Sequence, residues 1–245
     1  MPPTIDFTAF LSASDAERAS RTLHELHRHR TESLVLTGGM AIEFHMLRLG
    51  LAAGTRPLND IDFLAASFDD IPQTLSDGLL FRHVHPNDPP GKTMLQCVHP
   101  ETAVRVDIFR AYGNTMDRAE RVELCGASLR IISLEDLTAR TARLCMDLAA
   151  NAPIPAKHAR DFLRLLPVVN LGCIDAVWLE HRKPNHPESF AAAAALLQDR
   201  IATRNDLQIV PVYSQDVHAA CSRCRETEAF PLTGAVRIQS LLGYC

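Results

Sequence analysis

The chain has 245 residues, of which 47% are hydrophobic and 22% charged, and this composition excludes long disordered regions. Its net charge of −4 excludes an overall basic field of the kind that binds nucleic acid. The first residues lack a signal peptide pattern, the longest apolar stretches are too short to span a bilayer, and the seven cysteines are odd in number and scattered. These features predict a cytoplasmic protein with reduced thiols and without a membrane partner.

The first half of the chain alternates between helical and strand patterns. A capping box at 14–17 predicts a helix that runs to about residue 30, and helical periodicity returns at 40–49 after a glycine pair. A further helix is expected near 71–80. Strands are expected at 34–36, 60–63, 81–85, 92–98, 102–109, 121–125 and 128–132, with a hairpin loop at 86–91.

The second half has a different character. Ser133-Leu134-Glu135-Asp136 is a second capping signature, and almost all later residues follow helical periodicity. Breaks are expected at 151–155, 170–172 and 184–187. The sequence therefore predicts an α+β protein, in which a mixed β-sheet flanked by helices occupies residues 1–130 and a helical C-terminal domain occupies residues 131–245.

Two acidic residues within one predicted strand point to chemistry. Because side chains alternate between the faces of a strand, Asp60 and Asp62 share one face and lie roughly 6–7 Å apart. Folding gains nothing from two like charges on one face. Such a pair fits divalent cations, and two metal ions can clamp a phosphoryl transfer. The pair indicates a metal-dependent enzyme that handles nucleotides.

Two neighbouring features extend this site. Thr37-Gly38-Gly39 lies where a strand meets a helix, so that free N–H groups of the helix N-terminus can receive phosphate, although a tight turn alone would also explain a glycine pair. Asp107 lies on a later strand. It completes a cluster of three carboxylates if that strand neighbours the one with Asp60 and Asp62; otherwise it is a solvated strand residue.

These motifs together resemble the nucleotidyltransferase superfamily that includes DNA polymerase β, and within it the AbiEii-type abortive-infection toxins. The resemblance covers roughly residues 33–166. It rests on Leu36-Thr37-Gly38-Gly39-Met40-Ala41, on Arg56, on Asp60-Ile61-Asp62-Phe63, and on two later stretches, Ser133-Leu134-Glu135-Asp136-Leu137-x-Ala139 and Lys157-His158-x-x-Asp161-Phe162.

The resemblance implies Mg²⁺-dependent transfer of a nucleoside monophosphate from an NTP to a hydroxyl of RNA or protein, as the toxin of a toxin–antitoxin pair with an antitoxin protein as partner. The helical domain would close over the nucleotide. The implied site consists of two Mg²⁺ ions held by Asp60 and Asp62, with Asp107 on the catalytic ion, and of nucleotide-binding residues Thr37, Gly38, Gly39, Arg56 and Lys157.

Two departures from the family pattern support an alternative. Leu58 stands where a small hydroxyl residue is common, and Thr141 stands where a lysine is common. A catalytically weakened, nucleotide-binding regulatory module of the same fold is therefore a second hypothesis.

A third hypothesis is a structural zinc-binding protein. It rests on three soft ligands near the C-terminus, His218, Cys221 and Cys224, to which Cys245 adds a fourth. A helix that carries two partly buried thiols explains the same residues.

Overall fold

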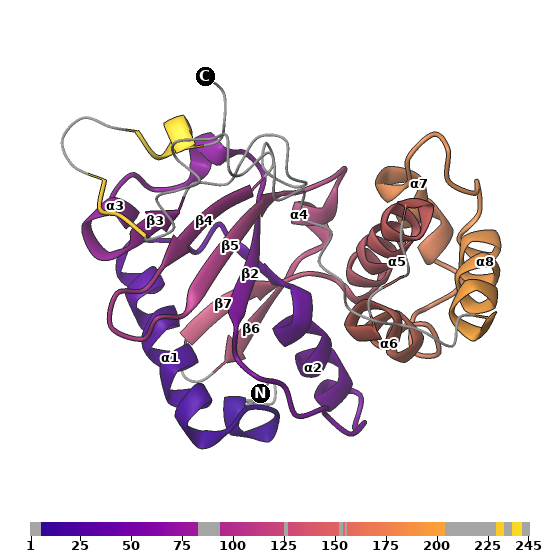
Figure 1. The fold of residues 1–245 in the computed structure, drawn as a ribbon, viewed down its shortest axis with the longest axis horizontal. Helices are drawn as coiled ribbons and strands as arrows, with labels where there is room; N and C mark the ends of the chain where they lie inside the picture. Colours follow the sequence, from indigo (N-terminus) through magenta and orange to yellow (C-terminus); the bar gives the residue numbers. More distant parts are fainter. Residues whose placement is uncertain are drawn as a thin grey trace. The chain divides into compact units, whose positions relative to one another are not determined.

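The structure is a computed structural model that describes residues 6–82, 94–124, 127–151, 154, 156–203, 229–232 and 237–241. The chain divides into two compact units, one of residues 1–111, 119–131 and 213–245 and one of residues 112–118 and 132–212 (Figure 1). The predicted α+β class, with a mixed sheet, flanking helices and C-terminal helices, is confirmed. Within the described ranges, every helix is too short or too polar to cross a lipid bilayer.

The first unit is built on a mixed sheet with the strand order β3-β4-β5-β2-β1-β7-β6 among the described residues. Strand β2 is parallel to β5 and antiparallel to β1, so its two neighbours hold it on both sides. Because side chains alternate along a strand, this register decides which residues of the three strands share a face. The strands are β1 (Val35–Thr37), β2 (Asp60–Ala65), β3 (Leu80–Arg82), β4 (Met94–Val98), β5 (Arg105–Arg110), β6 (Glu120–Leu124) and β7 (Ala127–Ile131).

Helices pack against this sheet, with contacts between α1 and β7 and between α2 and both β1 and β2. The described helices of the first unit are α1 (Ala13–Arg28), α2 (Gly38–Arg48) and α3 (Leu75–Gly78), with 3₁₀ turns at Phe7–Ala9, Phe68–Asp70 and Ile238–Leu241. The predicted start of α1 at Ser14 was wrong. Ser12 is the N-cap, because its hydroxyl accepts the N–H of Asp15 at 3.2 Å, and Ser14 lies inside the helix.

Two predicted elements are shorter than expected. The helix expected at 71–80 was wrong in extent, because it is confined to α3 and Leu80 already pairs with Val98 as part of strand β3. The strand expected at 102–109 begins at Arg105, because Ala103 has a φ of 54° and the turn before the strand bonds back to His99. The hairpin loop expected at 86–91 lies outside the described residues.

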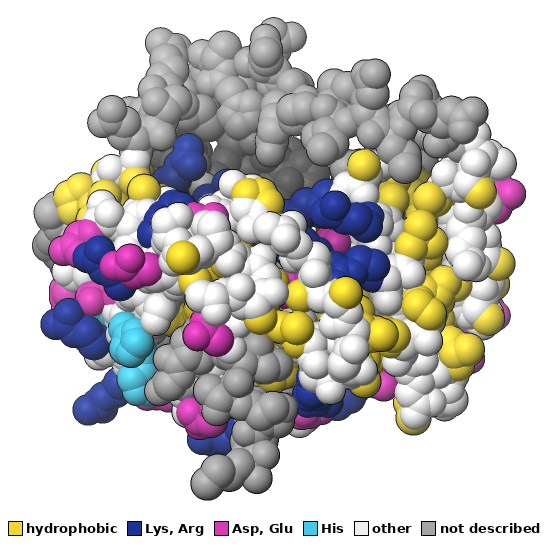
Figure 2. All heavy atoms as spheres, turned by 90° about the horizontal axis from the view of Figure 1, so that it is seen from below, with side chains coloured by type: hydrophobic (Ala, Val, Ile, Leu, Met, Phe, Trp, Pro, Cys, Tyr) yellow, Lys and Arg dark blue, Asp and Glu magenta, His cyan; other side chains and the backbone are white. Residues whose placement is uncertain are grey.

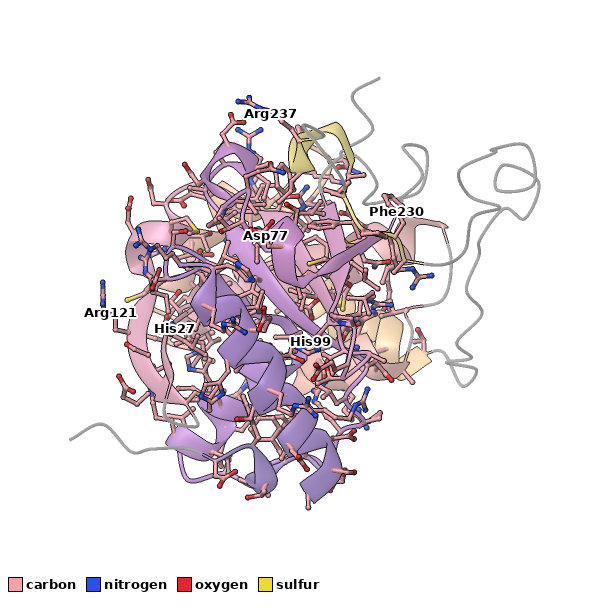
Figure 3. The ribbon with its side chains drawn as sticks, turned by 90° about the vertical axis from the view of Figure 1, so that its left-hand side faces the viewer. His27, Asp77, His99, Arg121, Phe230 and Arg237 are labelled. Atoms are coloured by element: carbon pink, nitrogen blue, oxygen red, sulfur yellow. The ribbon has the colours of Figure 1, made fainter. Side chains whose placement is uncertain are left out.

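The chain returns to the first unit near its C-terminus. Phe230, which is labelled in Figure 3, forms an antiparallel bridge with Phe81 of the edge strand β3. The bridge has hydrogen bonds of 2.8 and 2.9 Å. Further along, Ile238 is 1% exposed and its N–H donates to the side-chain oxygen of Gln73 at 3.1 Å. The bridge pairs the N–H and carbonyl of Phe81 at a sheet edge that would otherwise present them unpaired.

The described part of the second unit is helical and has a hydrophobic core of its own, built around Trp178, Phe162, Phe190 and Leu197. Its described helices are α4 (Thr115–Arg118), α5 (Leu134–Asn151), α6 (Ala156–Leu165), α7 (Ile174–His181) and α8 (Phe190–Thr203). As predicted, Ser133 caps α5, and its hydroxyl accepts the N–H of Asp136 at 3.0 Å.

A buried polar network joins three helices of the second unit. The carboxylate of Asp136 is fully buried and accepts hydrogen bonds from Arg118 of α4, His181 of α7, Ser133 and Thr115. Burial raises the pKa of Asp136, but these donors outweigh burial and hold that pKa well below its ordinary value. The network is fully inside the helical unit, and it explains why α4, which follows β5 in the chain, belongs with α5 and α7.

The surface agrees with the modest net charge. Figure 2 shows basic, acidic and hydrophobic side chains intermixed on one face of the molecule. With a net charge of −4, electrostatic attraction of a polyanion would have to come from a local site.

Candidate active site

Three carboxylates converge on two adjacent strands. The parallel register of β2 and β5 places Asp62 opposite Asp107, and Asp60 precedes Asp62 by one full strand period. One oxygen of each of the three lies within 4.8 Å of the others. The condition on which the predicted cluster depended, adjacency of these two strands, is therefore met.

The donor set of this carboxylate cluster fits a hard divalent cation. Mg²⁺ and Ca²⁺ take oxygen ligands, and carboxylates supply them with compensating charge. Asp60 and Asp62 are partly exposed, whereas Asp107 is 4% exposed. Burial raises the pKa of Asp107, against the lowering effect of Arg105 and of the hydrogen bond from Gln96. Roles of these residues as metal ligands and catalytic groups remain predictions.

The glycine pair lies directly beside the carboxylate cluster. Gly38 has a φ of +66°, and a Cβ atom at this position would collide with Oδ2 of Asp62. Glycine is required there for both reasons. Helix α2 begins at Gly38 and not at Met40 as predicted, so the first N–H groups of the helix start beside Asp62.

Thr37 is the N-cap residue of α2, but its side chain does not cap the helix. It lies opposite Asp62 in the register of β1 and β2, and it is 1% exposed. Its side chain makes no capping hydrogen bond, and its buried Oγ1 has no partner among the described residues. A buried hydroxyl without a partner is costly in the absence of a ligand or water. The helix N-terminus and this hydroxyl together suit an anionic oxygen.

Arg56 lies against the second glycine. A Cβ atom at Gly39 would be 2.9 Å from a terminal nitrogen of Arg56. The Nε of Arg56 bonds Oε1 of Glu43 at 2.5 Å, and the other oxygen of Glu43 accepts the N–H of Gly54 at 2.8 Å. Glu43 is fully buried and Arg56 is 9% exposed. This ion pair fixes the segment that leads into β2, and a phosphate-binding role for Arg56 remains a prediction.

The remaining predicted site residues lie elsewhere. Lys157 is exposed in the first turn of α6 in the second unit, and its role as a phosphate-side cation remains a prediction. The three residues of the predicted zinc site, His218, Cys221 and Cys224, lie outside the described residues.

Two residues that contact the cluster, Arg105 and Gln96, were not predicted. Arg105, which lies opposite Asp60 in the sheet, donates to Asp60 through its terminal nitrogen and to Oδ2 of Asp107 through Nε at 3.1 Å. Gln96 of β4 donates to Oδ1 of Asp107 at 2.9 Å. The sequence indicates that Arg105 and Asp107 share a face, because they lie two residues apart in a strand. It does not indicate the contact with Asp60, which depends on the register between β2 and β5.

Comparison with known proteins finds similar solved structures. No protein-family profile and no curated protein sequence matches the chain. The solution structure of the antibiotic-resistance factor ANT(2'')-Ia is 14% identical, with a TM-score of 0.46 over 77% of this chain and 99% of that one. Its crystal structure with adenylyl-2''-tobramycin is also 14% identical, with a TM-score of 0.46 over 75% of this chain and 98% of that one. JHP933 from Helicobacter pylori is 13% identical, with a TM-score of 0.42 over 78% and 95%.

Proposed function

We propose that the chain is a Mg²⁺-dependent nucleotidyltransferase, which moves a nucleoside monophosphate from an NTP to a hydroxyl of RNA or protein. The observation that carries the proposal is the position of the three carboxylates, whose oxygens lie within 4.8 Å of one another, beside the open N-terminus of α2. Cation ligands and an anion-binding helix end side by side suit a metal-bound polyphosphate.

The residues of the site would have two roles, phosphate binding and metal binding. The N–H groups of Gly38 and Gly39 and the hydroxyl of Thr37 would hold the outer phosphates, and Asp60, Asp62 and Asp107 would hold the metal. Bound Mg²⁺ would offset the charge of the triphosphate and favour the ionised acceptor hydroxyl.

The bonds that form and break are those of an in-line displacement. The acceptor oxygen bonds to the α-phosphorus as the bond from that phosphorus to the bridging oxygen breaks, and pyrophosphate leaves with the electron pair. Asp107 accepts the proton of the acceptor hydroxyl. The register that sets Asp107 opposite Asp62 supports this assignment, because it places a carboxylate beside the proposed metal ligands.

The finer assignment follows the family resemblance. The AbiEii-type pattern supports a toxin that is held in check by an antitoxin protein, with Arg56 and Lys157 as cations on the phosphate side and the helical unit closing over the nucleotide. In ANT(2'')-Ia the bound molecule is an adenylylated tobramycin. A small-molecule hydroxyl is therefore included among the acceptors to be tested.

The test is a labelling reaction with purified protein, Mg²⁺, each α-labelled NTP in turn, and total RNA, total protein or an aminoglycoside as acceptor. We expect label in one acceptor class, and at least about a hundredfold less with Asp62→Asn, because an amide offers the metal no charge. The matched control is Asp69→Asn, which changes an exposed aspartate of the same unit. Turnover by Asp62→Asn equal to that of the unchanged protein would overturn the assignment.

A second candidate function is nucleotide binding without turnover. Leu58 is 6% exposed, and Thr141 is buried with its hydroxyl donated to the carbonyl oxygen of Leu137 at 2.8 Å. Neither side chain therefore offers a polar group to a phosphate at the two positions that depart from the family pattern. Calorimetry that detects Mg²⁺–NTP binding, combined with no labelled product from any acceptor, would favour this regulatory module.

A further inference from the structure

The carboxylate cluster contains its own cation. Arg105 bridges two of the three carboxylates, because its Nε bonds Asp107 at 3.1 Å and its terminal nitrogen bonds Asp60. The two strands hold the three residues in place, since Asp60 lies opposite Arg105 and Asp62 opposite Asp107. The bridge therefore follows from the fold and not from a chance surface contact.

Charge balance explains why a cation is needed there. Three carboxylates with oxygens inside 4.8 Å repel one another, and the side chain of Asp107 is only 6% exposed, so water screens that charge poorly. The Arg105 guanidinium, which is 34% exposed, removes one of the three negative charges without being fully desolvated.

A divalent cation must compete with this guanidinium. One oxygen of Asp60 already accepts the terminal nitrogen of Arg105, and two cations that share one carboxylate repel each other. Asp107 differs from Asp60, because among the described residues a second side chain donates to it in addition to Arg105. Gln96 also holds the other oxygen of Asp107. Loss of Arg105 therefore leaves Asp107 oriented.

We propose that Arg105 is the resident counter-cation of the cluster, that a divalent metal displaces it from Asp60, and that this competition sets the metal affinity of the site. The inference rests on the proposed function in taking the carboxylate cluster as a metal site. Arg105 is a positioning residue in this role, because it acts through Asp60 and Asp107.

The test is a Mn²⁺ titration of the nucleotide-free full chain, followed by electron paramagnetic resonance and calorimetry. We expect Arg105→Gln to bind Mn²⁺ about tenfold more tightly, because it removes both a competitor and a positive charge near the ion. Arg105→Lys, which keeps the charge, should bind Mn²⁺ as the unchanged protein does. Arg48→Gln, which breaks the exposed pair with Glu120 in the same unit, is the matched control and should leave affinity unchanged.

A double-mutant cycle shows whether the effect runs through Asp60. In an Asp60→Asn background the carboxylate for which both cations compete is absent, so the gain from Arg105→Gln should be lost. On the unchanged protein, a Mg²⁺ titration should shift the Nε–H resonance of Arg105, and this measurement needs no variant to fold.

The outcomes separate the two proposals. If the unchanged protein binds Mn²⁺ and Arg105→Gln binds it equally or more weakly, the counter-cation role is overturned and the metal site stands. If neither protein binds Mn²⁺, with or without an NTP, the metal site and the proposed function are both overturned. If Arg105→Gln still increases Mn²⁺ affinity in the Asp60→Asn background, the proposal that the metal displaces Arg105 from Asp60 is overturned.

Discussion

Asp62 is the residue at which the two halves of the site meet. It lies opposite Thr37 on one side and opposite Asp107 on the other, and Gly38 leaves room for its carboxylate. A change at Thr37 or Gly38 therefore reaches the cluster through Asp62. The hydroxyl of Thr37 has no partner among the described residues, and Thr37 lies opposite Asp62, so the two side chains share one face of the sheet. A metal-bound phosphate would need both.

Ionised groups in the helical unit make its stability depend on pH. Hydrogen bonds from Arg118, ahead of those from the backbone and side chain of Asn114, lower the pKa of Glu180 from 4.5 to about 2. Because the folded value is lower than the unfolded one, the carboxylate stabilises the fold above about pH 4.5, and this stabilisation disappears as the pH falls through about 2.

We therefore expect Glu180→Gln to lower the free energy of unfolding by about 1–2 kcal/mol at pH 7 and by progressively less between pH 4.5 and pH 2. Denaturant unfolding at a series of pH values measures the difference. Glu188→Gln, at an exposed position of the same unit, serves as the control and should show no such trend. A deficit for Glu180→Gln that stays constant down to pH 2 would contradict the assignment.

At the scale of elements, the junction of β1 and α2 depends on two separate properties of Gly38. Its φ of +66° disfavours any side chain, and a Cβ atom would collide with Asp62. Gly50 isolates the first property, because its φ is +71° and a Cβ atom there would meet nothing within 4 Å among the described residues.

We expect Gly50→Ala to cost about 1 kcal/mol of stability and to leave Mn²⁺ binding unchanged. Gly38→Ala should cost more and should weaken Mn²⁺ binding at least about tenfold, because Asp62 must move. Thermal unfolding and a Mn²⁺ titration of both variants give the comparison. Equal metal affinity in the two variants would show that Asp62 tolerates the displacement.

The edge strand β3 offers a second prediction about an element. Proline at position 230 removes the N–H that donates to the carbonyl oxygen of Phe81 at 2.9 Å. We expect Phe230→Pro to lower the free energy of unfolding by about 1–3 kcal/mol. It should also speed hydrogen exchange at the amide of Phe81, because that N–H donates to the carbonyl oxygen of residue 230. Exchange at Leu36 of the central strand β1 is the internal control. Unchanged exchange at Phe81 would mean that the bridge contributes nothing to the edge.

Features that depend on neighbouring residues could be predicted from the sequence, whereas features that depend on pairing between distant strands could not. The shared face of Asp60 and Asp62 was predictable because strand alternation is a local property. The extent of α3 was not, because Leu80 is taken by its pairing with Val98, a partner that local periodicity cannot identify. Arg105 shows the same limit within the site, since its contact with Asp60 exists only through the register of β2 and β5.

At the scale of the whole molecule, the chain crosses between its two units more often than a single boundary near residue 130 implies. Residues 112–118 belong with the helical unit, and Arg118 within them bonds Asp136 and Glu180. The sequence near Arg118 carries no signal of these partners, which lie 18 and 62 residues away. The assignment of the helical unit as a domain that closes over the nucleotide remains a proposal.

The single tryptophan makes this closure measurable. Trp178 is fully buried in the core of the helical unit, and its ring N–H donates to the carbonyl oxygen of Pro187 at 2.9 Å. Tryptophan fluorescence therefore follows unfolding of that unit alone, whereas circular dichroism follows both units. Because each unit has its own core, ligand binding to one stabilises the other only if the ligand contacts both.

We expect Mn²⁺ alone to raise the transition seen by circular dichroism and to leave the Trp178 transition unchanged, since all three carboxylates belong to the first unit. Mn²⁺ with a non-hydrolysable NTP analogue at a hundred times its dissociation constant should stabilise the Trp178 transition as well, by up to about 2.7 kcal/mol. If Lys157 of the helical unit binds phosphate, Lys157→Gln should reduce only the stabilisation of the Trp178 transition by the analogue. If the saturating analogue leaves the unfolding transition of Trp178 unchanged, the nucleotide site is restricted to the first unit. That result would exclude closure of the helical domain over the nucleotide.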